Sequence, residues 1–369
     1  QGPYDRLKHS KLFGAGPTHV WLSTMPVLTA CDPQDIRMRL RFLCAQYGED
    51  IQRTGQALCE RAKALREAGV PEEAVRCVEE MDIAETLRCG AVNRKVLAGL
   101  FAAAEFVRPV GAPPKEGGAA LYDDAGQVLR GLARDWTEVA ASARAASLER
   151  VLRCLQEHLH IGDGDGHVLV PGCGLGRLAL EVAAKLHCQV VASDESAAMV
   201  ASLAGLLQQR RLTFFPALGA GAPGLGDNGA RFLELEAIIS EDLFAEAQGR
   251  LSLEHCDFTA KDAVPEDKFD AVATLFVLDA VASLPAAVEA VARALRLGGL
   301  WVNCGPLRKH RESRPFTFSD VALLAEAAGL AVVEESRFPD CDYMPREVAL
   351  GLREVYEVQL LVARRVDGA

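Results

Sequence analysis

The chain has 369 residues and a formal net charge of −11 at pH 7, with half of its residues hydrophobic and a quarter charged. This balance is typical of a globular protein with a sizeable core, and the acidic surplus argues against a general nucleic-acid-binding surface. No apolar run is long enough to cross a bilayer, and the 11 cysteines include no Cys-x-x-Cys pair, so we expect neither a membrane span nor a metal site. Free thiols indicate the cytoplasm or the nucleus.

The N-terminal part of the chain predicts helices. Residues 1–34 have no clear period and are interpreted as an arm, in part tag-derived or disordered. Recurring apolar positions and the proline-then-acid start at Pro71 predict a helical domain over 35–150. Its last helix is predicted over 121–155, after a Pro- and Gly-rich loop at 109–118.

From 151 to 369 short apolar runs alternate with helical stretches. This alternation predicts a doubly wound α/β fold with a seven-stranded, mostly parallel sheet. The last strand follows its predecessor after a loop only, and we expect it to insert antiparallel. An insert at about 212–250 is too long for an ordinary connection. The predicted strands are 168–170, 189–192, 251–255, 269–277, 300–303, 330–334 and 356–362.

A glycine-rich turn follows the first of these strands. Gly172, Gly174 and Gly176 stand between the strand and the next helix, with Cys173 and Arg177 beside them. Glycine lets the backbone turn sharply and approach a ligand closely. The G-x-G-x-G spacing is typical of methyltransferases, whereas nicotinamide enzymes use G-x-G-x-x-G. We therefore expect S-adenosylmethionine as cofactor and S-adenosylhomocysteine as product.

Acidic residues end the later strands. Asp194 and Glu195 lie about twenty residues past the turn, where one carboxylate can accept hydrogen bonds from ribose hydroxyls and the other can cap a helix. At the end of the following strand, Asp257 is placed to bind the adenine amino group and Phe258 to frame the base. Leu275, on a later strand, joins this set. The carboxyl ends of parallel strands meet in one crevice, so we expect one cofactor site.

Several segments resemble the carnosine N-methyltransferase family, over roughly residues 120–365. The resemblance implies a Rossmann-like class I methyltransferase with an N-terminal helical extension. It implies methylation of an imidazole nitrogen in carnosine or a related histidine-containing small molecule. It also places Arg134 at the methionine carboxylate of the cofactor. The segments that carry the resemblance are 134–138, 168–179, 257–258, 269–279 and 301–310.

The resemblance assigns the substrate side by position. Asp279, His310 and Tyr356 match family positions that hold the substrate and serve catalysis, and Tyr343 is a further candidate. Glu354 stands where the family has a tyrosine. A neutral imidazole offers a lone pair near pH 7, and His310 could orient it or accept its proton. Structural alternatives are a helix cap for Asp279, a solvated basic loop for His310 and a core position for Tyr356.

The sequence leaves three functions open. The first is a small-molecule N-methyltransferase, without nucleic acid or membrane partners, as a monomer or a homodimer. The second is a protein methyltransferase acting on histidine or another side chain, with the helical extension and the insert binding a polypeptide. The third is a non-catalytic scaffold that binds the cofactor. A nicotinamide oxidoreductase is disfavoured by the glycine spacing.

Overall fold

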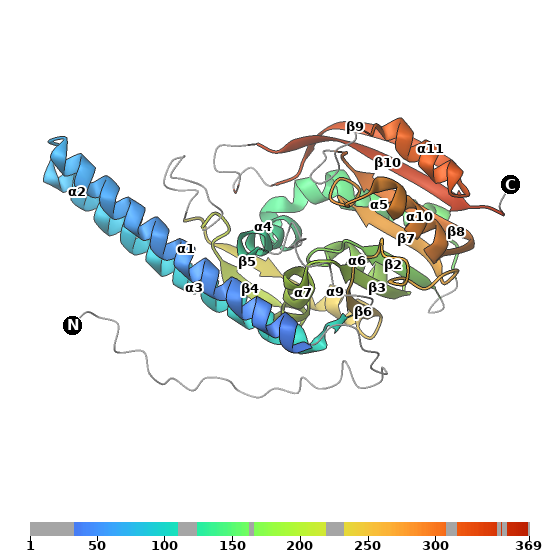
Figure 1. Ribbon diagram of the computed structural model, residues 1–369, viewed down its shortest axis with the longest axis horizontal. Helices are drawn as coiled ribbons and strands as arrows, with labels where there is room; N and C mark the ends of the chain where they lie inside the picture. Colours follow the sequence, from blue (N-terminus) through green and yellow to red (C-terminus); the bar gives the residue numbers. More distant parts are fainter. Residues whose placement is uncertain are drawn as a thin grey trace.

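The computed structural model describes residues 33–109, 124–161, 166–218, 232–307, 316–344, 348 and 353–367. A long helical hairpin projects from one side of a sheet whose two faces are covered by helices (Figure 1). These two parts correspond to the predicted helical extension and the predicted Rossmann-like domain. None of the helices in the described ranges is both long and apolar enough to span a membrane.

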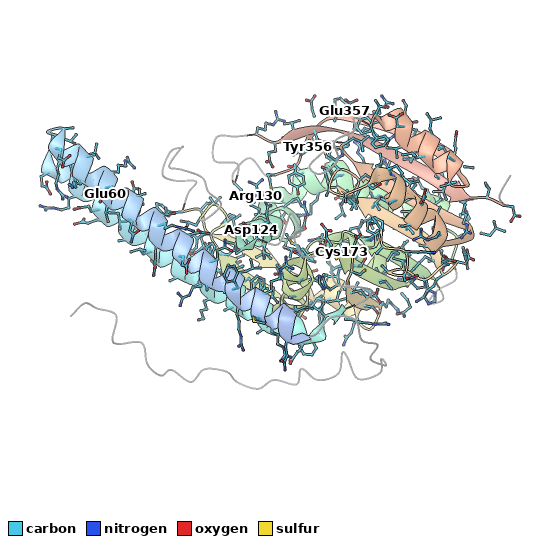
Figure 2. The ribbon with its side chains drawn as sticks, viewed as in Figure 1. Glu60, Asp124, Arg130, Cys173, Tyr356 and Glu357 are labelled. Atoms are coloured by element: carbon cyan, nitrogen blue, oxygen red, sulfur yellow. The ribbon has the colours of Figure 1, made fainter. Side chains whose placement is uncertain are left out.

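The projecting hairpin is formed by α1 and α3, which run antiparallel (Figure 1). At 1.5 Å per residue, the 35 residues of α1 extend about 50 Å. Apolar side chains such as Leu58, Ala62 and Val75 are buried along the seam. Glu60 lies far out on the hairpin, away from the sheet (Figure 2). The elements of the extension are α1 Pro33–Glu67, α2 Glu72–Cys77, a π-helical turn Val78–Ile83, α3 Ala84–Phe101 and a 3-10 turn Ala102–Phe106.

Asn93 of α3 joins the hairpin to the sheet domain through buried hydrogen bonds. Its amide oxygen accepts from the backbone N–H of Phe215, and its NH₂ group donates to the carbonyl of Phe215, both at 2.8 Å. The same NH₂ group donates to the hydroxyl of Tyr47 at 2.8 Å, and that hydroxyl donates to the carbonyl of Leu218 at 3.1 Å. Each buried polar group would cost about 1–3 kcal/mol if it were unpaired. Asn93 and Tyr47 thus supply buried polar contacts for the docking of the hairpin, beside the apolar packing of residues such as Leu100.

We expect Asn93→Ala to lower the free energy of unfolding by about 2–4 kcal/mol, because it leaves the backbone N–H of Phe215 buried without its acceptor and removes a donor from the Phe215 carbonyl and from the Tyr47 hydroxyl. Chemical denaturation of the full chain measures this loss. Arg94→Ala, at the exposed neighbouring position, is the matched control and should change stability by no more than about 0.5 kcal/mol. An Asn93→Ala protein as stable as the wild type would show that the hairpin is held by apolar packing alone.

The main sheet has eight strands in the order β1-β6-β3-β2-β7-β8-β10-β9. The first six strands in this order, which end with β8, are parallel to one another. The strand β10 lies between β8 and β9 and is antiparallel to both. The seven predicted strands and the antiparallel insertion of the last one are confirmed. The sequence missed β1, because two residues are too few to show a period. The strands are β1 Arg108–Pro109, β2 His167–Pro171, β3 Gln189–Asp194, β6 Leu251–His255, β7 Phe269–Leu275, β8 Leu295–Gly305, β9 Leu330–Asp342 and β10 Val355–Arg365.

Both faces of the sheet are buried under helices. Alternate side chains of one strand enter different cores: Val168 and Val170 pack with the first set of helices, and Leu169 packs with the second. This alternation explains why the parallel strands appear in the sequence as continuous apolar runs. The first set is α5 Ala141–His158, α6 Arg177–Lys185 and α7 Ala197–Gln209, and the second is α10 Leu284–Ala294 and α11 Phe318–Ala327.

The prediction of one helix over 121–155 is wrong, because α4 Ala125–Trp136 and α5 are separate helices. Thr137 has extended backbone angles and ends α4. Its hydroxyl donates to the carbonyl of Ala133, and Arg144 donates to the carbonyls of Arg134 and Thr137. These side chains satisfy carbonyls that a continuous helix would pair, which hydrophobic periodicity does not reveal.

The predicted insert at about 212–250 forms secondary structure where it is described. It contains the antiparallel pair β4 Arg211–Phe214 and β5 Leu235–Ile238, followed by α9 Glu241–Ala247. The predicted domain boundary at 150 falls inside α5, which packs on the sheet. Asp124 caps the start of the preceding helix, α4, by accepting from the backbone N–H groups of Gly126 and Gln127. Asp124 lies between the projecting hairpin and the main sheet in the view of Figure 2.

Candidate active site

A cavity with an empty volume of about 1020 Å³, part of it open to solvent, lies at the carboxyl ends of β2, β3, β6 and β7. The strand order reverses between β2 and β7, and ligands bind open α/β sheets at such a switch point. Helix α4 covers one side of the cavity, and Tyr343 and Met344, which follow β9, complete the wall. The sheet therefore places a ligand-sized cavity where the sequence predicts the cofactor.

The glycine turn forms part of the cavity wall, and two of its glycines serve different needs. Gly176 has φ +74° where α6 begins, and a Cβ there would lie 2.3 Å from the side chain of Leu203. Gly174 has φ +54°, and a Cβ there would meet only Arg134 within 4 Å, at 3.7 Å. Gly176 thus leaves room for the buried side chain of Leu203, whereas Gly174 leaves space on the cavity side.

Asp194 and Glu195 have different surroundings, which separates the two roles that the sequence left open. The carboxylate of Asp194 accepts from the backbone N–H of Gly174 at 2.9 Å and from that of Ser196 at 2.8 Å. Asp194 therefore connects the glycine turn to the start of α7. Glu195 also lines the cavity, and its backbone carbonyl lies 3.0 Å from Nε2 of His255.

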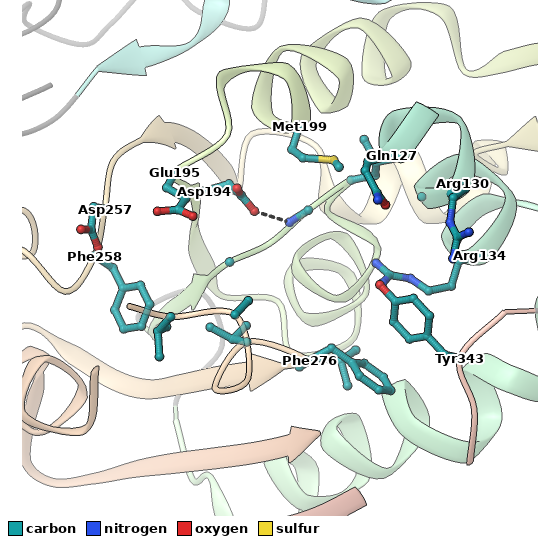
Figure 3. Close-up of a pocket in the computed structure, with 18 of the residues that line it drawn as sticks. Gln127, Arg130, Arg134, Asp194, Glu195, Met199, Asp257, Phe258, Phe276 and Tyr343 are labelled. Carbon is teal, nitrogen blue, oxygen red and sulfur yellow. Dashed lines mark hydrogen bonds between the residues drawn. The ribbon is translucent and has the colours of Figure 1, made fainter. Parts of the chain in front are cut away.

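The cavity has an acidic end and a basic end (Figure 3). Asp194, Glu195 and Asp257 lie at the acidic end together with Phe258, while Arg134 lies at the other end. Asp257 accepts from both the backbone N–H and the hydroxyl of Thr259, at 3.0 and 2.7 Å, which fixes its carboxylate. A ligand that carries hydroxyl and amino donors at one end and an anionic group at the other would fit this polarity.

Arg134 is held at the basic end by a dense set of contacts. Its Nε and Nη2 donate to the two carboxylate oxygens of Asp135, at 2.6 and 2.9 Å. Its Nη1 donates to the hydroxyl of Tyr343, and the guanidinium lies 4.9 Å from the centre of that ring. The indole N–H of Trp136 donates to the carbonyl of Leu175 at 2.9 Å. The end of α4 is thereby fastened to the glycine turn, with Arg134 facing the turn.

Three aromatic rings pack together beside Arg134. The ring centres of Phe276 and Tyr343 are 5.1 Å apart, those of Tyr343 and Tyr356 are 5.7 Å apart, and those of Phe276 and Tyr356 are 6.4 Å apart. Burial raises the pKa of Tyr343, Arg134 opposes this, and the carboxylates of Asp135 and Asp279 raise it further. The phenol of Tyr343 is therefore neutral at physiological pH.

The structure brings most of the predicted cofactor residues to the cavity, and fewer of the predicted substrate residues. His310 lies outside the described residues. The predicted residues that line the cavity are Arg134, Gly172, Gly174, Asp194, Glu195, Asp257, Phe258, Leu275 and Tyr343. The predicted residues that do not line it are Cys173, Gly176, Arg177, Asp279, Glu354 and Tyr356.

Two residues in the second group support the site from outside. Arg177 donates to Glu181 at 2.9 and 2.6 Å, and its guanidinium lies 4.9 Å from the ring centre of Trp136. It therefore joins α6 to the end of α4. The backbone N–H of Cys173 donates to the carbonyl of Ser193 at 2.9 Å, which closes the turn against β3.

Asp279 is 9 % exposed, and it lies close enough to Tyr343 to raise that residue's pKa. Tyr356 packs in the aromatic cluster. Glu354 forms an ion pair of 2.9 Å with Arg130. These three predicted substrate residues thus lie near Arg130 and Tyr343, at the basic end of the cavity, without lining it.

The sequence analysis missed further lining residues. Gln127, Arg130 and Gly131 precede Arg134 on α4 and line the cavity with it. Their spacing puts them on one helical face, and this spacing could have been found by following α4 backwards from Arg134. The apolar wall carries no chemical motif, so nothing in the sequence marked it. That wall includes Met199, Cys256, Val277, Ala280, Val281 and Ala282.

Comparison with known proteins gives one consistent family. The family model described as carnosine N-methyltransferase matches residues 119–213 and 226–367, which is more than half of the chain. A carnosine N-methyltransferase of Dictyostelium discoideum is 25% identical over 257 residues, which cover 66% of this chain and 54% of that protein. One of Schizosaccharomyces pombe is 29% identical over 196 residues, covering 50% of this chain and 52% of that protein.

The chain thus spans about half the length of these two relatives. Among solved structures, a phosphoethanolamine N-methyltransferase of Haemonchus contortus in complex with S-adenosylhomocysteine is similar, with a TM-score of 0.40 and 12% identity. That likeness covers 59% of this chain and 53% of the other. The family match takes in both the glycine turn and the strands that frame the cavity. The chain belongs to the carnosine N-methyltransferase family.

Proposed function

We propose that the chain is an S-adenosylmethionine-dependent N-methyltransferase that methylates an imidazole nitrogen of carnosine or a related histidine-containing small molecule. The polarity of the cavity carries this proposal. Its acidic end suits the hydroxyl and amino groups of an adenosine, and Arg134 at the other end suits a carboxylate. The family match and the names of the relatives supply the acceptor.

The described residues suggest how the cofactor would be held. Glu195 would accept from the ribose hydroxyls, because the carboxylate of Asp194 already pairs with two backbone N–H groups. Asp257 and Phe258 would hold the adenine, and Arg134 would bind the methionine carboxylate beside the open side of Gly174. When bound, S-adenosylmethionine supplies a methyl group on a sulfonium, which the acceptor nitrogen takes as the S–C bond breaks, leaving S-adenosylhomocysteine.

On the acceptor side, the chain has to orient a nitrogen lone pair and remove a proton. Tyr343, which lines the cavity, would contribute a neutral hydroxyl. Asp279 and Tyr356 do not line the cavity, and a role for them in holding the acceptor rests on the family resemblance. The role of His310 as a proton acceptor or an orienting group rests on the family resemblance alone. Neutral imidazole is the dominant form near pH 7, so the acceptor needs no strong base before it attacks.

A methylation screen read by mass spectrometry tests this proposal. Purified protein is incubated with S-adenosylmethionine and carnosine, histidine, other imidazoles or a protein extract. We expect one added methyl group on the imidazole of a histidine-containing small molecule. Labelling of polypeptides alone would instead identify a protein methyltransferase. Cofactor binding without any transfer would identify a scaffold, and binding of NADH in place of S-adenosylmethionine would contradict the reaction class.

A further inference from the structure

Helix α4 presents a second arginine to the cavity. Gln127, Arg130, Gly131 and Arg134 recur at intervals of three and four residues, and all of them line the cavity. Arg130 lies one helical turn before Arg134, at the same basic end (Figure 3). This end of the cavity therefore carries two guanidinium groups.

The proposed cofactor accounts for only one of these two cations. Its methionine part carries one carboxylate, and Arg134 is the arginine that adjoins the glycine turn, 3.7 Å from the position of a Cβ on Gly174. The acidic residues that line the cavity in the described ranges, such as Glu195 and Asp257, lie at the opposite end. Arg130 therefore has no counterpart in the cofactor and faces the region left for the acceptor.

Arg130 is held in place by Glu354. Its Nη2 donates to Oε2 of Glu354 at 2.9 Å, and the two side chains are 34% and 23% exposed. Glu354 does not line the cavity, and its own backbone carbonyl accepts from the N–H of Tyr343 at 3.0 Å. Within the described ranges, this ion pair engages one of the five N–H donors of the guanidinium. The remaining donors allow Arg130 to bind a second carboxylate.

We infer that Arg130 determines acceptor specificity by binding a carboxylate of the methyl acceptor, while Glu354 positions its guanidinium. This inference rests on the proposed function and adds a requirement to it: the preferred acceptor is a free acid rather than an amide or ester. A guanidinium and a carboxylate can pair through two parallel hydrogen bonds, which makes the contact directional as well as strong. The ion pair with Glu354 is partly exposed and therefore weak, so an incoming carboxylate can share the guanidinium.

The test compares carnosine with its C-terminal carboxamide in the wild type and in two variants. For Arg130→Gln, we expect the KM for carnosine to rise roughly 10-fold or more, the size of one lost charge-assisted hydrogen bond. The KM for the carboxamide and the Kd for S-adenosylmethionine should stay within about twofold. For Glu354→Gln, which loosens the guanidinium of Arg130, we expect the KM for carnosine to rise by about two- to fivefold with kcat unchanged.

Arg353→Gln is the matched control, because Arg353 pairs with Asp342 and lies outside the cavity. This variant should change the KM neither for carnosine nor for its carboxamide. If Arg130→Gln and Glu354→Gln reduced the turnover of carnosine and of its carboxamide equally, the ion pair would only stabilise the fold. The inference would then be overturned. Wild-type protein that methylates acid and amide with the same KM would overturn the inference while leaving the proposed function intact.

A protein that methylates neither compound would instead exclude carnosine as the acceptor of the proposed function. The Kd values of carnosine and its carboxamide, measured by calorimetry in the presence of S-adenosylhomocysteine, then make the same comparison without turnover. A preference for the acid that Arg130→Gln abolishes would support the carboxylate site. Equal binding of acid and amide, or no binding of the acid, would overturn it.

Discussion

Replacing Arg134 with alanine is expected to weaken the binding of S-adenosylmethionine roughly 100-fold or more, the largest effect of any single change in the site. The substitution removes the proposed partner of the methionine carboxylate. It also leaves the carboxylate of Asp135 and the hydroxyl of Tyr343 without the guanidinium that now joins them. Calorimetry with S-adenosylmethionine, together with initial rates at varied cofactor concentration, measures the loss.

Two further variants test whether a lower affinity for S-adenosylmethionine comes from the lost guanidinium of Arg134. Arg134→Lys keeps the charge but not the planar fork, so we expect it to recover only part of the affinity. Arg150→Ala is the matched control. The guanidinium of Arg150 also lies over an aromatic ring, 3.7 Å from the ring centre of Phe338, but Arg150 does not line the cavity. It should bind the cofactor as the wild type does. Wild-type affinity in Arg134→Ala would place the carboxylate elsewhere.

The sequence was sufficient for the sheet and the cofactor side because both leave local signals. Strands buried on two faces appear as continuous apolar runs, so β2 and β7 were found directly. The glycines at 172, 174 and 176 follow such a run, and Asp194 and Asp257 end or follow others. Because parallel strands end at one edge, these separate signals predicted one site.

The parts that the sequence did not predict depend on contacts between distant segments. Asp194 and Glu195 are neighbours in the chain, and the hydrogen bonds that Asp194 accepts from the backbone N–H groups of Gly174 and Ser196 set its surroundings apart. The end of α4 is set by side chains that pair with its last carbonyls. The pairing of Arg130 with Glu354 joins residues 224 positions apart, which no local pattern can reveal.

Two of the three positive-φ glycines of the turn, Gly174 and Gly176, should separate stability from cofactor binding. For Gly176→Ala, we expect the free energy of unfolding to fall by about 2–4 kcal/mol. The left-handed backbone is strained by a Cβ, and that Cβ would lie 2.3 Å from the fully buried side chain of Leu203. The midpoint and slope of chemical denaturation measure this change.

For Gly174→Ala, the same backbone strain applies, but the added Cβ enters open space near Arg134, so we expect a stability loss of only about 1–2 kcal/mol. The methyl group would occupy the cavity side of the turn, and the affinity for S-adenosylmethionine should fall about tenfold or more. Each variant serves as the control for the other, because both add one methyl group to a left-handed glycine. If Gly174→Ala were the less stable of the two and bound the cofactor normally, the open side of Gly174 would not be the cofactor surface.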